Sequence, residues 1–350
     1  MKIALLTDTH FGAREGRNVF HNHFEKFYTN VFFPECQKQG VDTVIHLGDL
    51  FDRRKYIDYF SLKRAKEYFF EPLRDAGITM YVLVGNHDIS LRNSLDVNSP
   101  ELLLQEYKNI IPIATPQIVE FDTLPILLMP WICAENKDVS IDLLTTAQAE
   151  ICMGHFEISG FQMYRGMESH DGFEPKIFSR FDLVFSGHYH HRSYVGNIFY
   201  LGSPYEITFA DYNDARGFFV FDTATRDIQT INNKYTLFER YVYDDTLGSP
   251  GNVKVDTFAE KFLKIVVQKK TDYYKFDTFL DKVFNSGAHD VKIVEDISEL
   301  STEELDETID IEDTATILTH YIQHTDVLVD KNKLAKYMET LYIESLNLQI

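Results

Sequence analysis

Short apolar runs alternate with longer amphipathic segments along the first part of the chain. The short runs are typical of buried strands, whereas the longer segments repeat apolar residues at helical spacing. Gly40 and Gly77 stand where the two amphipathic segments stop, as glycine does at helix ends. The predicted strands are residues 2–7, 41–47 and 79–84, and the predicted helices are residues 20–39 and 59–75. This order predicts a mostly parallel sheet covered by helices.

Strand-like runs continue through the middle of the chain, with few helical segments between them. They cover residues 126–129, 150–153, 182–185, 198–201, 217–222 and 238–243. Because parallel strands need long crossovers, we expect a mixed second sheet that packs on the first. The predicted fold class is therefore α/β, a four-layer α-β-β-α sandwich.

A turn-rich stretch at residues 244–251 predicts a domain boundary. A strand, a helix and a strand follow at residues 262–268, 275–284 and 290–294, which predicts a small βαβ unit. Apolar residues recur at helical spacing in two segments of the tail, around Ile317–Ile322 and Leu334–Tyr342. The predicted domains are 1–245, the sandwich; 251–295, a small α+β cap; 296–312, an acidic linker; and 313–350, a helical C-terminal tail.

Composition and charge exclude some classes of protein and leave others open. The chain has 350 residues, 44% of them hydrophobic, but no apolar window long enough for a membrane span and no signal-peptide pattern at its start. Its three scattered cysteines suggest buried thiols in a reducing cytoplasm, where we expect the protein to act. The net charge of −20 argues against a free-standing nucleic-acid binder. Residues 293–330, however, carry many acidic residues and no Lys or Arg, so the charge does not exclude a phosphate substrate.

Polar side chains gather where the predicted strands end. In open α/β sheets, binding sites form beyond the carboxyl ends of the strands. The residues at five such ends are Asp8 and His10; Asp49 and Asp52; Asn86, His87 and Asp88; His155; and His188 and His190. Each one alone is typical of a polar turn, but all five in one chain predict a single site.

The donors in this set are carboxylate and amide oxygens and imidazole nitrogens, without cysteine. Such donors suit Mn, Fe or Zn and argue against a structural zinc site. Seven of these residues are candidate metal ligands: Asp8, His10, Asp49, Asn86, His155, His188 and His190. One metal ion cannot bind all seven and still bind a substrate. Two metals that share a carboxylate would use them, and such pairs clamp phosphates for in-line displacement.

The motifs D-x-H, GD, GNHD, GH and GHxH, in this order, resemble those of the calcineurin-like metallophosphoesterases. The chain is most similar to the branch of DNA-repair nucleases typified by bacterial SbcD and the eukaryotic meiotic-recombination nuclease. Within that branch it looks most like the recombination endonuclease subunits of T-even-type phages. The stretches that carry this likeness are "GDLFDRRK", "GHFEISGFQMYRGMESH" and "LGSPYEITFADYNDARGFFVFDT".

The resemblance implies a role for each residue of the site. One metal would be held by Asp8, His10, Asp49 and His190, and the second by Asp49, Asn86, His155 and His188, so that Asp49 bridges them. His87 would stabilise the phosphate or protonate the leaving 3′-oxygen, with Asp88 as the residue that orients it. Some relatives carry histidine at the position of Asp52, so a supporting role behind the ligands is expected for this aspartate.

Residues beside the motifs are weaker candidates. Arg53, Arg54 and His170 are candidate DNA contacts, although such residues are often part of a solvated surface. The remaining histidines are expected to be packing or surface residues, not ligands: His21, His23, His46 and His191.

The implied function is that of a Mn²⁺-dependent DNA nuclease subunit, with exo- and endonuclease activity, in a recombination or repair complex; Mg²⁺ is the alternative metal. The implied partners are DNA and an SMC-like ATPase of the SbcC type, bound through the C-terminal helices unless these fold back on the sandwich. Two copies would pair through helices at 59–75 and 99–109 within a heterotetramer, in the host cytoplasm if this is a phage protein. The apolar face of this pairing would come from Phe69, Phe70, Leu102, Leu103 and Tyr107. A small-molecule or nucleotide phosphodiesterase, a phosphoprotein phosphatase and an inactive scaffold are the competing hypotheses.

Overall fold

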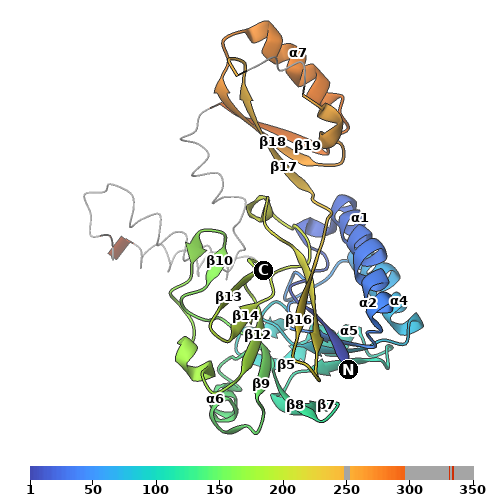
Figure 1. Ribbon diagram of the computed structural model, residues 1–350, viewed down its shortest axis with the longest axis vertical. Helices are drawn as coiled ribbons and strands as arrows, with labels where there is room; N and C mark the ends of the chain where they lie inside the picture. Colours follow the sequence, from blue (N-terminus) through green and yellow to red (C-terminus); the bar gives the residue numbers. More distant parts are fainter. Residues whose placement is uncertain (248–252, 296–330, 332, 335–350) are drawn as a thin grey trace. The chain divides into compact units, whose positions relative to one another are not determined.

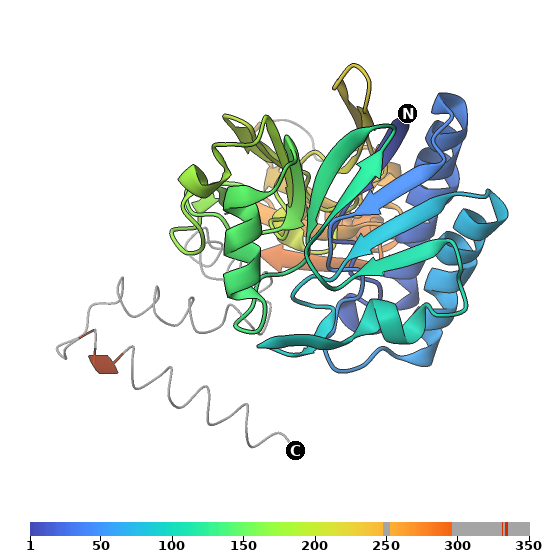
Figure 2. The ribbon, with the colours of Figure 1, turned by 90° about the horizontal axis from the view of Figure 1, so that it is seen from below.

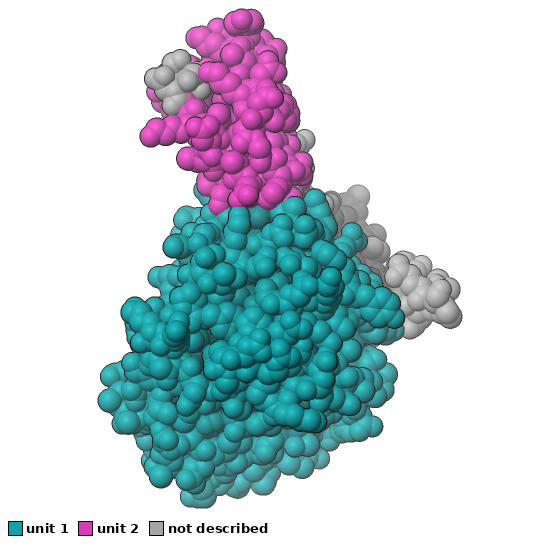
Figure 3. Space-filling view, turned by 90° about the vertical axis from the view of Figure 1, so that its right-hand side faces the viewer, with its two compact units in different colours: residues 1–207, 211–237 teal, residues 208–210, 238–350 magenta. Residues whose placement is uncertain are grey.

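The computed structural model describes residues 1–247, 253–295, 331 and 333–334. The predicted acidic linker and the predicted tail helices therefore lie almost wholly outside the described residues. The chain divides into two compact units, coloured separately in Figure 3. Unit 1 comprises residues 1–207 and 211–237, and unit 2 comprises residues 208–210 and everything from Phe238 onward. None of the described helices has the length and apolar content of a membrane span.

Unit 1 contains, within the described residues, two six-stranded mixed sheets. The first runs β16 (Ile228–Asn232), β15 (Gly217–Asp222), β1 (Lys2–Leu6), β2 (Thr43–His46), β3 (Thr79–Leu83) and β6 (Ile110–Ile113). The second runs β13 (Ser193–Val195), β14 (Ile198–Tyr200), β12 (Leu183–Gly187), β9 (Ile151–His155), β8 (Leu124–Met129) and β7 (Gln117–Phe121). The central strands β1, β2 and β3, and likewise β8, β9 and β12, are parallel, so their carboxyl ends meet at one edge of each sheet. The predicted mixed second sheet is present, but the predicted strand 217–222 is β15 of the first sheet and not part of the second.

The two sheets pack face to face. Alternate residues of each strand point to opposite sides, so one set lies between the sheets and the other set lies on the outer face. In β8, Ile126 and Leu128 belong to the core between the sheets. Leu127 and Met129, on the other face of the same strand, pack in an outer core with Leu144 of α6 (Lys137–Thr146). Figure 2 shows α6 (green) beside the second sheet and the blue helices beside the first. Both faces of each sheet are thus covered.

Each of the two long predicted helices is present as two α-helices joined without a gap by a wider π-turn. The first run is α1 (Asn18–Phe27), a π-turn (Tyr28–Phe32) and α2 (Phe33–Gln39); the second is α3 (Tyr59–Ala65), a π-turn (Lys66–Phe70) and α4 (Glu71–Asp75). In both runs a proline, Pro34 or Pro72, is the second residue after the π-turn. Proline has no N–H and crowds the carbonyl four residues back, so the wider turn accommodates it without ending the helix.

The buried faces of these helices are lined by aromatic side chains, and this corrects the predicted pairing surface. Phe69 and Phe70 are fully buried and Tyr107 is 4% exposed. The ring of Phe70 contacts those of Phe69 and Tyr107, and also the ring of Phe11 in the loop after β1. Phe69, Phe70 and Tyr107 therefore fill the core of unit 1 and cannot form an exposed apolar face; among the five predicted residues, Leu102 is exposed.

Several short elements were not predicted. They include the hairpin β4 (Ile89–Leu91) and β5 (Ser94–Asn98), the hairpin β10 (Gln162–Tyr164) and β11 (Met167–Glu168), and 3-10 turns at Arg14–Gly16, Pro175–Phe178, Phe209–Asp211 and Val255–Phe258; a further short helix, α5 (Ser99–Leu103), covers the start of the predicted helix at 99–109. The predicted helix at 99–109 is only the single short helix α5. Their few residues carry no periodic pattern long enough to recognise.

Unit 2 contains a three-stranded parallel sheet of β17 (Phe238–Asp244), β18 (Phe262–Lys269) and β19 (Asp290–Val294). Helix α7 (Tyr273–Phe284) lies along one face of this sheet (Figure 1), where its Phe276 and Phe279 pack on Leu263 and Ile265. The prediction that residues 238–243 belong to the first domain is wrong, because β17 lies in unit 2. The turn-rich stretch 244–251 connects two paired strands of unit 2, so the division of the chain lies before Phe238.

Candidate metal centre

The carboxyl ends of the parallel strands bring two groups of acidic and imidazole side chains together in unit 1. Asp8, His10 and His190 form one group, and Asp49, His155 and His188 form the other. Within each group the potential ligand atoms all lie within 4.8 Å of one another. Each group takes ligands from both sheets, since the aspartates and His10 follow strands of the first sheet and the other histidines belong to the second.

The backbone at these positions is strained. Asp8, His10, Asp49 and His188 all have positive φ angles, between 44° and 87°, a region that residues with a side chain seldom adopt. Backbone hydrogen bonds hold the loops in this shape: Asp8 N–H donates to the Gly48 carbonyl (3.1 Å) and His10 N–H to the Asp49 carbonyl (3.2 Å). Strain of this kind persists only where the surroundings enforce it, and it is concentrated at functional sites.

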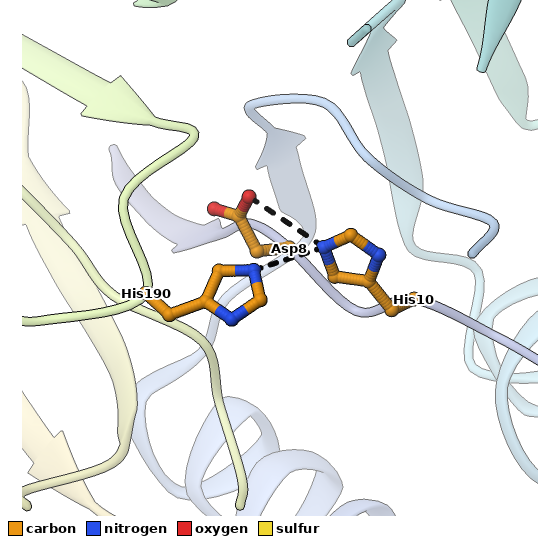
Figure 4. A group of neighbouring side chains, drawn as sticks. All are labelled: Asp8, His10 and His190. Carbon is orange, nitrogen blue, oxygen red and sulfur yellow. Dashed lines mark hydrogen bonds and ion pairs between the residues drawn. The ribbon is translucent and has the colours of Figure 1, made fainter. Parts of the chain in front are cut away.

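The first group converges on one point. In Figure 4 the Nε2 atom of His190 faces that of His10, and the two atoms are 3.0 Å apart. The Asp8 carboxylate lies 4.0 Å from His10 Nε2 and accepts hydrogen bonds from the Thr7 hydroxyl (2.7 Å) and the His188 N–H (3.1 Å). Two imidazole nitrogens and a carboxylate aimed at the same place are the donor set of a metal site.

The second group includes Asn86, as the resemblance implies. Its side-chain oxygen lies 2.9 Å from Nε2 of His155 and 3.1 Å from Nδ1 of His188. The other ring nitrogen of His155, Nδ1, lies 2.7 Å from the Leu47 carbonyl, to which it donates. This hydrogen bond orients the ring and leaves Nε2 as the nitrogen available to a metal.

Asp49 belongs to the second group, but its carboxylate also faces the first group. Its Oδ2 is 3.2 Å from His155 Nε2 and 3.9 Å from His10 Nε2, while its Oδ1 accepts the backbone N–H of His87 at 2.9 Å. One carboxylate oxygen therefore faces a nitrogen of each group. This is the position that a bridging ligand requires.

Burial and mutual charge govern the electrostatics of the centre. Burial raises the pKa of Asp8 above its usual value. Burial alone would also raise the pKa of Asp49, but the imidazoles of His155, His87 and His10 lower it well below its usual value. Burial lowers the pKa of His155 and the Asp49 carboxylate more than reverses this, so that the pKa of His155 rises to about 9. The buried carboxylates of Asp8 and Asp49 are thus stabilised by nearby positive charge. A metal ion would compete with protons for the carboxylate and imidazole groups of the centre.

The residues fit a pair of divalent metal ions. The fully buried Asp8 and His155 and the nearly buried Asp49 and His10 could not share this space as uncompensated charges. Oxygen and imidazole donors without thiolate suit divalent ions such as Mn²⁺, Mg²⁺, Fe²⁺ or Zn²⁺. Two buried His/Asp sites for divalent metals are therefore present in unit 1.

His87 and Asp52 lie next to the ligands. Nδ1 of His87 donates to the Asp52 carbonyl at 2.6 Å, and its ring packs edge-on against His10 with centroids 4.8 Å apart. The Asp52 carboxylate lies 3.5 Å from Nδ1 of His10, on the side of the ring away from the convergent Nε2. Asp52 thus supports His10 through its side chain and orients His87 through its backbone.

Asp88 does not occupy the position expected of a residue that orients His87. Its buried carboxylate accepts hydrogen bonds from the N–H groups of Leu50 (3.1 Å), Phe51 (3.1 Å) and Gly85 (3.0 Å), and from the Ser99 hydroxyl (3.2 Å). The hypothesis is corrected: the Asp52 carbonyl contacts the His87 ring. Asp88 instead joins the loop after β2 to the loop after β3, and so fixes the two loops that carry Asp49 and Asn86.

Two glycines of the motifs are required by close approach to these ligands. A Cβ on Gly85 would lie 2.2 Å from Oδ1 and 2.3 Å from the backbone nitrogen of Asp49. Gly48 has φ +104°, and a Cβ there would lie 2.5 Å from Nδ1 of His155. Any side chain at either position would displace a ligand of the centre.

The candidate DNA contacts lie outside the two metal groups. Arg53 is exposed, with its guanidinium 5.2 Å from the Tyr56 ring, and Arg54 is half-buried. The His170 side chain is 84% exposed and lies 3.9 Å from Glu168. A role for these three residues in DNA binding is therefore a proposal.

The remaining histidines have other partners. His21 is buried between the hydroxyls of Tyr68 and Ser61, each 3.0 Å away, and burial lowers its pKa to about 4. His23 is buried, and His46 lies in the core with Nε2 3.0 Å from the Thr9 hydroxyl. His191 lies 2.9 Å from Asp214. None of the four belongs to a metal group among the described residues.

Two residues of the site were missed by sequence reasoning. Trp131, the single tryptophan, packs its ring against those of His188 (5.2 Å between centroids) and His155 (5.9 Å). Arg216 is buried and donates to the His190 carbonyl. Trp131 follows the end of β8, so the rule applied to the other strand ends would have found it. Arg216 follows no such end, and the sequence carries no signal for it.

The comparisons with known proteins agree with this geometry. Residues 1–192 match the family model described as calcineurin-like phosphoesterase, and the chain belongs to this family. Over 348 residues it is 33% identical to exonuclease subunit 1 of Enterobacteria phage T4, an alignment that covers 99% of each chain. The resemblance inferred from the motifs is thereby confirmed.

A second relative is more distant. The DNA double-strand break repair protein Mre11 of Sulfurisphaera tokodaii is 26% identical over 205 residues, which cover 55% of this chain and 49% of the relative. A solved structure described as a novel archaeal phosphodiesterase aligns at 15% identity with a TM-score of 0.33, covering 67% of this chain and all of the other. The latter likeness is too low to bear on the fold.

Proposed function

We propose that this protein is the Mn²⁺-dependent nuclease subunit of a DNA recombination or repair complex, with exo- and endonuclease activity. The observation that carries the proposal is the pair of His/Asp groups around Asp49, in a chain homologous over its full length to exonuclease subunit 1 of phage T4. One ion would be held by Asp8, His10, Asp49 and His190. The other would be held by Asp49, Asn86, His155 and His188.

The chemistry divides between the metals and the protein. Divalent ions held by these residues would supply positive charge for the phosphodiester and would lower the pKa of a water molecule, so that it could act as the nucleophile near neutral pH. Within the chain, Asp49 would be shared by both ions, and backbone carbonyls such as that of Leu47 orient the histidine rings.

His87 supplies the proton in this proposal. With Nδ1–H donated to the Asp52 carbonyl, the protonated imidazolium form of His87 would give its Nε2 proton to the leaving 3′-oxygen and become the neutral ring. His87 is largely buried, with 8% of the residue exposed, beside the ligand His10. Asp52 supports both His10 and His87, while Arg53, Arg54 and His170 contact the DNA backbone.

The partners are part of the proposal. The T4 relative is named as a subunit of an exonuclease, and we assign this chain the same kind of assembly: DNA as substrate and an SbcC-type SMC-like ATPase as partner. The ATPase binds the C-terminal helices predicted at 313–350, the unit with β17–β19 serves as a DNA-contacting cap, and two copies pair within a heterotetramer. Since the relative is a phage protein, the proposed compartment is the cytoplasm of the host.

The decisive experiment compares substrates in the presence of Mn²⁺ and the ATPase. Purified protein is offered end-labelled duplex and single-stranded DNA, an aryl phosphodiester, a cyclic nucleotide and a phosphopeptide. We expect cleavage of DNA and of the aryl ester, with Mg²⁺ a poorer cofactor. Asp49→Ala should lose nearly all of both activities and bind less metal by elemental analysis while keeping its circular dichroism spectrum. Hydrolysis of the small esters or the phosphopeptide without any attack on DNA would favour the competing phosphodiesterase or phosphatase hypothesis.

A further inference from the structure

An open pocket lies beside the metal centre. Its volume is about 150 Å³, smaller than the pockets that hold drug-sized ligands, so it has room for a single small group; its wall includes Phe11, Asp52, Arg53, Tyr56 and Ile57. The Asp52 carboxylate lies 3.5 Å from His10, so the pocket and the centre share this residue as a wall. A group bound in the pocket would be adjacent to a phosphate bound at the metals.

Aromatic side chains stand exposed at the rim of the pocket. Tyr56, which lines the pocket, is 60% exposed; Tyr59 and Phe60, just beyond it in the chain but not part of the pocket wall, are 91% and 45% exposed. Exposed aromatic side chains so close together mark a binding surface more often than a solvated one. The guanidinium of Arg53, which faces the Tyr56 ring at 5.2 Å, holds this ring at the edge of the pocket.

The charges around the pocket indicate what it would accept. Glu15, Asp52 and Asp58 contribute three carboxylates to its lining, against the single cation of Arg53. An excess of negative charge disfavours a phosphate in the pocket itself. A flat, neutral group with amino donors matches both the aromatic ring and the carboxylates.

We propose that this pocket binds one unpaired nucleobase of the DNA strand that is cut, stacked on the ring of Tyr56. The inference rests on the proposed nuclease function and assigns its substrate: a strand whose bases are free next to the scissile phosphate. Aromatic platforms of this kind bind single strands without reading their sequence. Paired DNA would have to open at this position before it could be cut, as it does for enzymes that extrude a base.

The test compares cleavage kinetics of end-labelled oligonucleotides in Mn²⁺ by the full-length protein. We expect Tyr56→Ala to raise KM for a single strand about tenfold or more, the size of one lost base–aromatic stack. Tyr56→Phe, which keeps the ring, should restore the wild-type KM. Tyr59→Ala, a more exposed tyrosine outside the pocket, is the matched control and should change KM little. Hydrolysis of the aryl phosphodiester, which has no nucleobase, should be the same in all variants.

Oligonucleotides with a single abasic position, moved along the strand, identify the base concerned. For the wild-type protein one position should raise KM as much as Tyr56→Ala does, and in Tyr56→Ala the same abasic position should have no further effect. A wild-type KM in Tyr56→Ala, additive effects of the two changes, or equal losses on closed duplex and single strand would overturn the inference while leaving the nuclease function intact. A wild-type protein that hydrolyses the aryl ester but cuts no DNA would overturn both.

Discussion

Replacing Asp88 by asparagine tests whether this buried carboxylate connects the ligand loops or acts through His87. The carboxylate accepts hydrogen bonds from three backbone N–H groups and one hydroxyl. Whichever way the amide of Asn is turned, its NH₂ faces at least one of these N–H donors. A lost charged hydrogen bond costs about 1.5–3 kcal/mol, and a buried N–H left unpaired costs about 1–3 kcal/mol more.

Burying a neutral amide instead of an anion offsets part of this loss, because burial and the nearby Asp49 raise the pKa of Asp88. We therefore expect Asp88→Asn to lower the free energy of unfolding by about 3 kcal/mol, toward the lower end of the summed range. In a unit of this size that corresponds to a fall in Tm of roughly 6–12 °C. Fluorescence of Trp131 during urea unfolding without metal reports unit 1 specifically.

Kinetics and a control variant complete the test. At saturating Mn²⁺, turnover of an aryl phosphodiester by Asp88→Asn should stay within about tenfold of wild type, with a higher Mn²⁺ requirement, since second-shell changes typically cost 10–100-fold in metal affinity. Asp58→Asn is the control: Asp58 caps α3 through one backbone N–H, and asparagine caps equally well, so stability should hardly change. Unchanged stability of Asp88→Asn with strongly reduced turnover at saturating metal would refute the reasoning and return Asp88 to the catalytic residues.

Three further predictions concern other residues. His87→Ala should keep metal and DNA binding but lower the rate by about two to four orders of magnitude; loss of metal in calorimetry would make His87 a ligand instead. Because Trp131 packs on His188, bound Mn²⁺ should quench the fluorescence of Trp131, and the midpoint of this quenching should shift to a higher Mn²⁺ concentration in His188→Ala. Trp131 fluorescence that does not change when Mn²⁺ is added would contradict the assigned site. Burial lowers the pKa of His21 to about 4, so the unfolded chain binds more protons than the folded one between pH 6.5 and 4, and stability falls as pH drops through this window. The loss from pH 7 to pH 5 should be about 2 kcal/mol, and His21→Gln should lack this contribution; equal pH slopes for both proteins in urea unfolding would contradict it.

The sequence allowed the two sheets and the ligand positions to be predicted for one reason. Strand ends in parallel sheets meet at one edge, so residues after separate strands could be combined before any contact was known. Asp88 shows the limit of this reasoning. A carboxylate in a turn looks the same in the sequence whether it faces a neighbouring ring or backbone N–H groups, and only the folded loops distinguish the two.

The errors about Phe69, Phe70 and β17 have a similar origin. An apolar stripe on a helix indicates that one face of the helix is buried. It does not indicate whether this face packs in the chain's own core or against a second copy of the chain. The turns after β17 likewise connect strands within unit 2 as well as they could separate two domains. In both cases the missing information is long-range packing, which local pattern does not contain.

The division of the ligands between two sheets has a consequence for the protein while it is being made. Synthesis delivers Asp8, His10, Asp49 and Asn86 first, and His155, His188 and His190 only much later. Strand β15, which pairs with β1 and so completes the sheet that carries the first ligands, emerges later still. A partly synthesised chain therefore holds three of the four ligands proposed for one ion and two of the four proposed for the other, and hydrolytic activity is expected only when unit 1 is nearly complete. Potentially harmful chemistry is thereby delayed until the fold that controls it exists.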